Sequence, residues 1–248
     1  MTLIAPVLLA LLGAIVGSFL ATLAVRWPEG RSVMAGRSAC DGCGRTLAAR
    51  ELVPLLSGLL ARGRCRGCGA RIDPAHWRIE LACLLVGASA GLAAPWPEAA
   101  AGAVFGWLLV ALAALDLRHW WLPDRLTATL ALAGVASAAV GPPDLSDRLI
   151  GGAAGFGSLW LIAAAYKRVR GREGMGGGDP KLLGAIGLWL GWRMLPATLL
   201  LASLIGLGVV LFQLVRGRAV AGDQAVPFGA LLAAAAYPAW IAVVTVGP

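Results

Sequence analysis

Charged residues are scarce in this chain of 248 residues. Only 14% are Asp, Glu, Lys or Arg, whereas 59% are apolar, and a soluble domain has about 25% charged residues. This deficit excludes an ordinary water-soluble core and places the chain among membrane proteins. Histidine is also rare, with two residues. A histidine-based metal site therefore cannot be assembled inside the apolar segments.

Basic residues are absent from the first 25 positions, because Arg26 is the first Lys or Arg. A cleaved signal peptide begins with a basic region. We therefore interpret residues 1–25 as a permanent first transmembrane helix.

Long apolar runs occupy most of the rest, and a helix of about 20 apolar residues crosses a bilayer core. The sequence predicts an all-α polytopic membrane protein with about eight transmembrane helices. The cluster of Gly191, Trp192, Arg193 and Pro196 predicts a tight turn between two short helices in residues 181–215. The predicted spans are residues 3–25, 79–94, 99–117, 125–141, 148–166, 181–192, 194–215 and 226–246.

Basic residues favour one side of this topology. With the N-terminus outside, four loops face the cytosol, and with the adjoining span ends they hold all of the 21 Lys and Arg residues except Arg148 and Arg193. These loops are residues 26–78, 118–124, 167–180 and 216–225. Because basic residues collect in cytosolic loops, the net charge of +8 indicates topology and contact with membrane lipid, not nucleic-acid binding.

The predicted domains are the first helix (residues 1–25), a small cytosolic loop domain (residues 26–78) and a transmembrane core (residues 79–248). The loop domain holds four of the five cysteines, in two segments of the pattern C-x-G-C-G that begin at Cys40 and Cys65. Cys83 lies in an apolar run and is predicted to be a small packed residue.

Two such cysteine pairs are typical of a tetrahedral zinc site. The predicted ligands are Cys40, Cys43, Cys65 and Cys68, and a structural role is favoured because four thiolates leave no open position on the metal. The glycine after each pair permits a turn with positive φ, and nearby Arg45, Arg64 and Arg66 would offset the thiolate charge. Two disulfides or a redox-active pair are the alternative, which a cytosolic location disfavours.

Two aspartates are predicted at the cytosolic ends of helices, where they could meet. Asp116 ends an apolar run, and Asp179 follows Gly176, Gly177 and Gly178 and begins the next span. In such a pair one ionised carboxylate activates water and a protonated partner assists the scissile carbonyl oxygen, because like charges close together leave one proton on the pair. The glycines would let an extended substrate approach the backbone.

Simpler roles for these acids stay open at this point. Asp116 could be an interfacial cap or a partner of Arg118 or Arg125. Asp179 could be a helix N-cap, and N-cap is the leading interpretation of Asp124, which follows a proline and precedes a helix.

Short motifs run in order along nearly the whole chain. They are Gly17-Ser18-Phe19-Leu20 with Arg26-Trp27-Pro28; the two cysteine pairs; Pro54-Leu55-Leu56-Ser57 with Arg62-Gly63-Arg64-Cys65; Arg78-Ile79-Glu80-Leu81; Asp116 with Leu122-Pro123-Asp124; Gly176-Gly177-Gly178-Asp179 with Lys181-Leu182-Leu183; and Val226-Pro227-Phe228-Gly229. Together they resemble the type IV prepilin peptidases, a family of G-x-G-D intramembrane aspartic proteases. The chain departs from the family pattern at Ala21, Gly177 and Pro180.

The resemblance implies an enzyme of the bacterial inner membrane that cleaves the short basic leader from prepilins or pseudopilins, as in type IV pilus assembly and type II secretion. It implies that Asp116 and Asp179 are the catalytic pair at the cytosolic face and that the cysteine loop holds Zn²⁺. It also implies N-methylation of the new N-terminus with S-adenosylmethionine. The oligomeric state stays open.

Two other classes of function are weighed beside this one. A proton-coupled transporter would place its acids near the bilayer midplane in broken helices, whereas these acids cluster at one face. A non-catalytic assembly protein would use the zinc loop as a docking module and would keep its function after Asp116→Asn or Asp179→Asn.

Overall fold

The computed structural model describes residues 3–34, 36–217 and 226–246, and 74% of the chain is helical. The described residues form no strand, and their extended pairing is limited to two isolated bridges, Ala39 with Thr46 and Arg64 with Arg71. The all-α class is therefore confirmed. The chain divides into two compact units, Met1–Leu92 and Ala93–Pro248. Most of the predicted cytosolic loop at residues 216–225 lies outside the described residues.

The first unit is built on two closely packed helices, α1 (Ile4–Arg26) and α3 (Ala75–Ala93). A Cβ added to Gly87 of α3 would collide with the backbone of Leu9 in α1. Small residues at such crossings let helix backbones approach closely in a membrane. Cys83, one turn before Gly87, is fully buried, which confirms it as a packed residue.

The chain between α1 and α3 contains one short helix, α2 (Leu56–Leu60), and is otherwise irregular. Glu80 ties this segment to α3, because its buried carboxylate accepts a hydrogen bond from the backbone N–H of Leu55 at 2.7 Å. Leu55 has a φ of 61°, a conformation that is costly for a leucine. The contact with Glu80 therefore holds the segment in an otherwise unfavourable turn.

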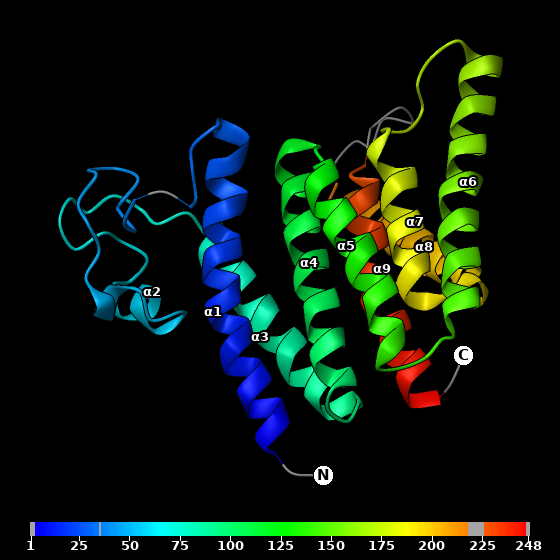
Figure 1. Ribbon diagram of the computed structural model, residues 1–248. Helices are drawn as coiled ribbons and strands as arrows, with labels where there is room; N and C mark the ends of the chain where they lie inside the picture. Colours follow the sequence, from blue (N-terminus) through cyan, green and yellow to red (C-terminus); the bar gives the residue numbers. More distant parts are fainter. Residues whose placement is uncertain (1–2, 35, 218–225, 247–248) are drawn as a thin grey trace. The chain divides into compact units, whose positions relative to one another are not determined.

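The described residues of the second unit form six α-helices (Figure 1). They are α4 (Glu98–His119), α5 (Asp124–Ala136), α6 (Leu145–Arg170), α7 (Gly178–Leu190), α8 (Leu195–Val215) and α9 (Phe228–Val246). Helix α7 lies among α5, α6 and α9. Its Trp189 is buried, stacks on Phe105 of α4 at 4.6 Å between ring centroids, and donates Nε1–H to the Leu130 carbonyl at 2.8 Å.

Helices α6 and α7 meet through glycines. A Cβ on Gly151 of α6 would lie 2.5 Å from the carbonyl oxygen of Gly187 in α7, and one on Gly155 would lie 2.6 Å from the carbonyl oxygen of Leu183. The backbones are thus in direct contact. This contact sets the position of α7, whose first turn carries Asp179.

A turn separates α7 from α8, as the sequence predicted for residues 181–215. Helix α7 ends at Leu190, and Gly191 has a φ of 73°, which glycine adopts without a steric cost. A 3₁₀ turn at Trp192–Met194 then leads into α8. Only α7 is short, with 13 residues against the 21 of α8.

All eight predicted spans coincide with helices, but eight membrane crossings are not confirmed. Five helical segments among the described residues are long and apolar enough to cross a bilayer: Ile4–Glu29, Glu98–His119, Leu145–Arg170, Trp192–Val215 and Phe228–Val246. Helices α5 and α7 have 13 residues each. At 1.5 Å per residue they are about 20 Å long, which is less than the hydrocarbon core of about 30 Å.

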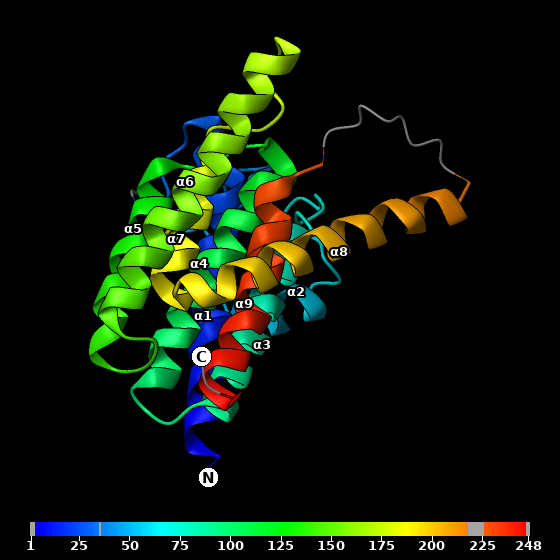
Figure 2. The same ribbon diagram turned by 90° about the vertical axis from the view of Figure 1, so that its right-hand side faces the viewer.

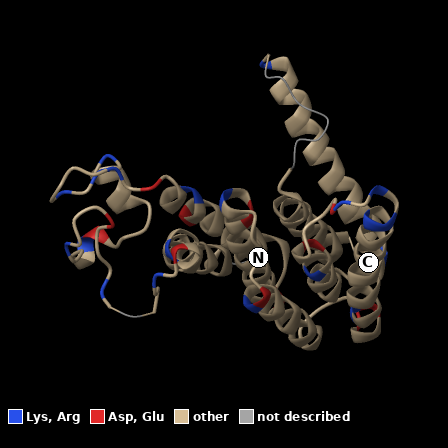
Figure 3. Cartoon of the chain, turned by 90° about the horizontal axis from the view of Figure 1, so that it is seen from above, with Lys and Arg blue, Asp and Glu red and all other residues tan. Residues whose placement is uncertain are grey.

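Helix α8 projects from the other helices of the second unit (Figure 2). It carries no charged residue from Leu195 to Val215, and Figure 3 draws it in tan along its length. Its leucine and phenylalanine side chains are largely exposed, such as Leu207 and Phe212. A large exposed apolar surface of this kind is typical of contact with lipid.

Arg148 of α6 lies inside the second unit and is 2% exposed. Its guanidinium contacts six acceptors, all of them neutral. They are the carbonyl oxygens of Gly134, Gly141, Pro142, Pro143 and Leu188, and the hydroxyl of Ser137, at 2.8 to 3.1 Å. Arg148 thereby joins the C-terminal ends of α5 and α7 to the start of α6.

Candidate active site and metal centre

Asp116 lies in the last turn of α4, which ends at His119. Trp120 closes the helix with a φ of 53°, and its N–H donates to the Asp116 carbonyl at 3.0 Å. The same end of the second unit holds the start of α5, α7 and α9 (Figure 1). Asp116 is 6% exposed, so its carboxyl group points into this group of helix ends.

The Asp116 carboxylate binds the N-terminus of α9. Its Oδ2 accepts a hydrogen bond from the backbone N–H of Ala230 at 2.8 Å. The first N–H groups of a helix have no partner within the helix, and the helix dipole favours a negative group at this end. A Cβ on Gly229 would lie 3.0 Å from the same oxygen, so the glycine lets the carboxylate reach the helix end.

Asp179 lies in the first turn of α7 and is 7% exposed. Its N–H donates to the Gly176 carbonyl at 3.3 Å. Gly177 occupies the N-cap position, which leaves the N-cap alternative for Asp179 without support. Both predicted aspartates are therefore buried at helix ends of the second unit, in the last turn of α4 and the first turn of α7. Their pairing stays a prediction.

The predicted glycine loop, Gly176 to Gly178, lies beside Asp179. Gly176 and Gly177 are exposed and Gly178 is half-buried. A Cβ on Gly176 would lie 3.6 Å from Asp179 Oδ2, and nothing lies within 4 Å of one on Gly177. The exposed backbone of these two residues is thus open to a ligand next to the Asp179 carboxyl group.

Leu122, between α4 and α5, contacts both α7 and α9. The sequence did not predict these contacts. A Cβ on Gly178 would lie 2.9 Å from Leu122 Cβ, and one on Gly229 would lie 2.7 Å from Leu122 Cδ1. The leucine therefore packs against α7 and α9 at once. The signal was present in the motif Leu122-Pro123-Asp124, but its partners are distant in sequence.

The N-cap interpretation of Asp124 is wrong. Helix α5 begins at Asp124 itself, and its N-cap is Pro123, with a φ of −64° and a ψ of 128°. The proline ring fixes this φ, and the helix starts one residue earlier than the prediction requires. The Asp124 carboxylate instead pairs with Lys181 of α7 at 2.7 Å. It is 72% exposed, and exposed ion pairs of this kind contribute about 0–1 kcal/mol.

The four predicted metal ligands come together in the first unit. The sulfur atoms of Cys40, Cys43, Cys65 and Cys68 all lie within 4.8 Å of one another. Those of Cys40 and Cys68 are 3.9 Å apart. Zinc bound tetrahedrally at about 2.3 Å from each sulfur requires sulfur atoms about 3.8 Å apart, so this cluster fits the metal.

The two cysteine segments, Cys40–Arg45 and Cys65–Ala70, have the same backbone geometry. In each, the glycine after the second cysteine has a positive φ, 70° at Gly44 and 74° at Gly69, as the sequence predicted. Each segment has three matching hydrogen bonds. In the first segment, Gly44 N–H donates to the Cys40 carbonyl at 2.9 Å, Cys40 N–H to the Arg45 carbonyl at 2.9 Å, and Gly42 N–H to the Cys40 sulfur at 3.4 Å. In the second segment, Gly69 N–H donates to the Cys65 carbonyl at 2.9 Å, Cys65 N–H to the Ala70 carbonyl at 2.8 Å, and Gly67 N–H to the Cys65 sulfur at 3.4 Å.

Donors around Cys65 prepare it to bind a metal. The backbone N–H of Cys68, then that of Gly67, and then the Cys40 side chain lower the pKa of the Cys65 thiol to about 6. The thiolate is the form that coordinates zinc. The four clustered cysteines form no disulfide within the described residues, so the disulfide alternative has no support in the structure.

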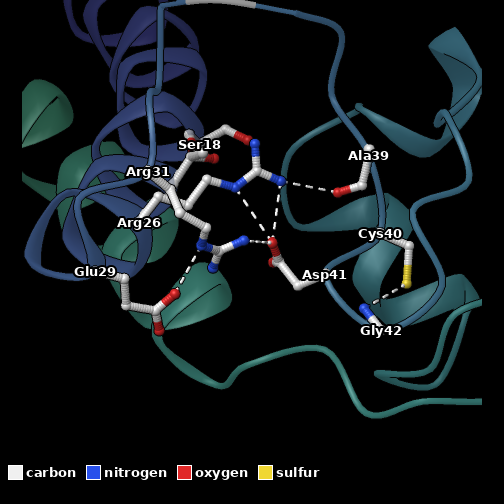
Figure 4. A network of polar contacts seen from close by, with 9 residues as sticks. Ser18, Arg26, Glu29, Arg31, Ala39, Cys40, Asp41 and Gly42 are labelled. Carbon is white, nitrogen blue, oxygen red and sulfur yellow. Dashed lines mark hydrogen bonds and ion pairs between the residues drawn. The ribbon is translucent and has the colours of Figure 1, made fainter.

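An ionic network links the first cysteine segment to the end of α1 (Figure 4). The Asp41 carboxylate lies between two guanidinium groups, at 3.1 Å from Arg26 and 2.8 Å from Arg31. Arg26 also donates to the Ala39 carbonyl at 2.9 Å. The residue beside a metal ligand is thus anchored to the last turn of α1.

Two family models and several curated proteins match this chain. Residues 103–211 match the type IV leader peptidase family, and residues 11–93 match the bacterial Peptidase A24 N-terminal domain. A protein of Aeromonas hydrophila named prepilin leader peptidase/N-methyltransferase is 43% identical over 216 residues, which are 85% of this chain and 72% of that protein. The chain belongs to the type IV leader peptidase family.

Two further relatives of this chain are also named prepilin leader peptidase/N-methyltransferase. The protein of Burkholderia pseudomallei is 44% identical over 201 residues, covering 80% of this chain and 64% of that protein. The protein of Pseudomonas aeruginosa is 35% identical over 260 residues, covering 94% of this chain and 87% of that protein. No solved structure matches the chain. Membership confirms the family and the enzyme class that the motifs predicted, while the roles of individual residues stay predictions.

Proposed function

We propose that this leader peptidase removes the leader from prepilins or pseudopilins, with Asp116 and Asp179 as its catalytic pair. The observation that supports the proposal is the burial of both carboxyl groups at helix ends, with Leu122 packed against Gly178, next to Asp179, and against Gly229, next to the Asp116 carboxylate. Buried acids inside a membrane protein are costly and are retained mainly for function. In this proposal the pair faces the cytosolic side of the bacterial inner membrane, consistent with the distribution of Lys and Arg.

The pair supports hydrolysis of a peptide bond by general acid–base chemistry. One carboxylate takes a proton from water, and the water oxygen attacks the scissile carbonyl carbon. The other carboxyl group gives its proton to the carbonyl oxygen, so a neutral tetrahedral intermediate forms. When the C–N bond breaks, the departing amine takes a proton from the first carboxyl group, and the intermediate's hydroxyl proton returns to the second.

The exposed backbone at Gly176 and Gly177 gives the substrate a place to bind. An extended peptide can pair with free backbone N–H and C=O groups as an added strand. Glycines leave room for this approach because they carry no Cβ. We propose that the residues around the cleavage site pair with this loop, which presents the scissile bond to the adjacent Asp179.

The metal centre has a structural role in this proposal. Cys40, Cys43, Cys65 and Cys68 hold Zn²⁺, which fixes the irregular segment between α1 and α3. Four thiolates leave no open coordination position for a substrate or a water molecule, so the reaction does not pass through the metal. N-methylation with S-adenosylmethionine belongs to the proposal through the name of the relatives. The described residues mark no methyl-donor site, and we assign none.

The test is a cleavage assay in reconstituted membranes. A prepilin is incubated with the wild type, with Asp179→Asn and with a control, Asp144→Asn, which changes an exposed aspartate at the start of α6. Mass spectrometry of the products reads leader removal and methylation together. We expect cleavage by the wild type and the control and none by Asp179→Asn. Cleavage by a folded Asp179→Asn at the wild-type rate would exclude Asp179 as a catalytic group.

A further inference from the structure

The two cysteine segments are near copies that differ where each faces the other. A Cβ on Gly42 of the first segment would lie 2.9 Å from the Cβ of Ala70, and a Cβ on Gly67 of the second would lie 2.8 Å from Nε of Arg45. Arg45 and Ala70 occupy equivalent positions, two residues after the second cysteine of each pair. One segment therefore presents a guanidinium where the other presents a methyl group.

Glu51 holds the Arg45 guanidinium in a fixed orientation. Arg45 Nη2 donates to Glu51 Oε1 at 2.7 Å and Nη1 to Oε2 at 3.1 Å, which is a two-point contact of the kind that fixes arginine geometry. Glu51 is itself fixed by the backbone N–H of Ala48 at 2.9 Å. The Arg45 guanidinium lowers the pKa of Glu51 to about 2, so the pair is ionised at neutral pH.

The third nitrogen of Arg45 points at the second cysteine segment. Both terminal nitrogens are used by Glu51, whereas Nε is buried and has no hydrogen-bond acceptor within the described part of the chain. A buried donor without an acceptor is unfavourable. This nitrogen lies against Gly67, whose own N–H donates to the Cys65 sulfur at 3.4 Å. Cys65 is the most buried of the four ligands.

We propose that Arg45 is a positioning residue of the metal centre, whose Nε–H supports the Cys65 sulfur when the metal is bound and is aimed by Glu51. Four thiolates around a divalent ion leave a net negative charge, which a guanidinium beside one sulfur offsets. Outer partners of this kind orient the ligands, and their loss weakens metal affinity by about 10- to 100-fold. The inference rests on the metal site proposed above and singles out Arg45 from the three nearby arginines.

The test is a metal-binding measurement on the full-length protein in detergent. Zn²⁺ affinity is measured by competition with a chromophoric chelator for the wild type, Arg45→Met and Arg64→Met. The control removes the same charge beside Cys65, but the Arg64 side chain is exposed, and its one hydrogen bond within the described residues is to the Gly69 carbonyl, at 3.4 Å. Co²⁺ is the second probe, because its thiolate charge-transfer band reports the electronic state of the sulfur atoms.

We expect Arg45→Met to weaken Zn²⁺ binding by at least about 10-fold and to shift the Co²⁺ charge-transfer band, while Arg64→Met changes both much less. Glu51→Gln keeps the guanidinium but loosens its anchor, so we expect a smaller weakening in the same direction. If Arg45→Met does not fold, the Zn²⁺ affinity of Glu51→Gln tests the proposal in its place.

Equal Zn²⁺ affinities and equal Co²⁺ spectra for Arg45→Met and Arg64→Met would overturn the proposal. Where only Glu51→Gln folds, wild-type affinity in that variant would overturn it as well. Wild-type protein that binds no metal would overturn it together with the metal site. The aspartate assignment would still stand in that case, because it is tested separately by cleavage.

Discussion

The Asp116 carboxylate accepts a hydrogen bond from the backbone N–H of Ala230 at 2.8 Å, although 114 residues separate the two in sequence. The contact joins the last turn of α4 to the first turn of α9. A carboxylate at a helix C-terminus is disfavoured by the helix dipole, and the free N–H groups at the start of another helix offset this effect. The position of Asp116 therefore depends on α9 as much as on α4.

Replacing Asp116 by Asn should abolish cleavage without unfolding the protein. The amide is nearly the same size, and its oxygen can still accept from Ala230, but it cannot exchange a proton with water. We expect the rate of leader removal to fall by about 10⁴-fold, as for other residues that act directly in catalysis. Single-turnover cleavage assays measure this, with Asp144→Asn as the control. A residual rate within 10-fold of the wild type would contradict the assignment.

Replacing Gly229 by Ala should reduce cleavage by displacing the carboxylate. The added methyl group would lie 3.0 Å from Asp116 Oδ2 and 2.7 Å from Leu122 Cδ1, so one of them has to move. A misplacement of about 1 Å can lower a rate by about 100-fold. We expect the effect in kcat more than in KM. Gly208→Ala on α8 is the matched control, since nothing lies within 4 Å of its added Cβ; equal activities of the two variants would argue against this geometry.

Removing the metal should loosen both cysteine segments. Their turns depend on the N–H groups of Gly44 and Gly69, which donate to the carbonyls of Cys40 and Cys65 at 2.9 Å. We expect a chelator, or the variant Cys43→Ser, to accelerate hydrogen exchange at these amides while α4 and α7 stay protected. Hydrogen exchange followed by mass spectrometry reports both regions in one experiment. Unchanged protection of the segments after complete metal loss would show that the backbone alone holds them.

Replacing Arg148 by Met should strongly destabilise the second unit. Several carbonyl groups would lose their donor, and each buried, unpaired polar group costs about 1–3 kcal/mol. We expect a loss of more than about 3 kcal/mol in unfolding free energy, measured by denaturation in detergent. Arg193→Met is the control, because Arg193 is 58% exposed and its pair with Asp147 spans 3.7 Å. Similar stabilities for the two variants would contradict the role given to Arg148.

The helices and the metal ligands could be predicted because their signals are local. Apolar runs predicted eight of the helices that the described residues form, and Gly191 with Pro196 predicted the turn between α7 and α8. Two C-x-G-C-G segments predicted a four-sulfur cluster. Apolar runs could not set the number of membrane crossings, because α5 and α7 have apolar sequences but are only 13 residues long.

The contacts that position the carboxyl groups could not be predicted, because they join residues distant in sequence. Nothing near Asp116 indicates Ala230 as its donor, and nothing near Leu122 indicates that it packs against Gly178. Arg148 gave a misleading signal. The predicted topology placed Arg148 among the basic residues on the outer side of the membrane, whereas its side chain is buried among carbonyl groups. One-dimensional charge counting cannot distinguish these two situations.

The order of the Arg148 acceptors along the chain has a consequence for biosynthesis. Gly134, Ser137 and the carbonyls of residues 141–143 all precede Arg148, and only Leu188 follows it. The nascent chain therefore contains nearly every partner of this arginine by the time α6 leaves the ribosome. Helices α5 and α6 can therefore pack around this charge before α7 is made, and α7 can be added afterwards against a preformed glycine surface.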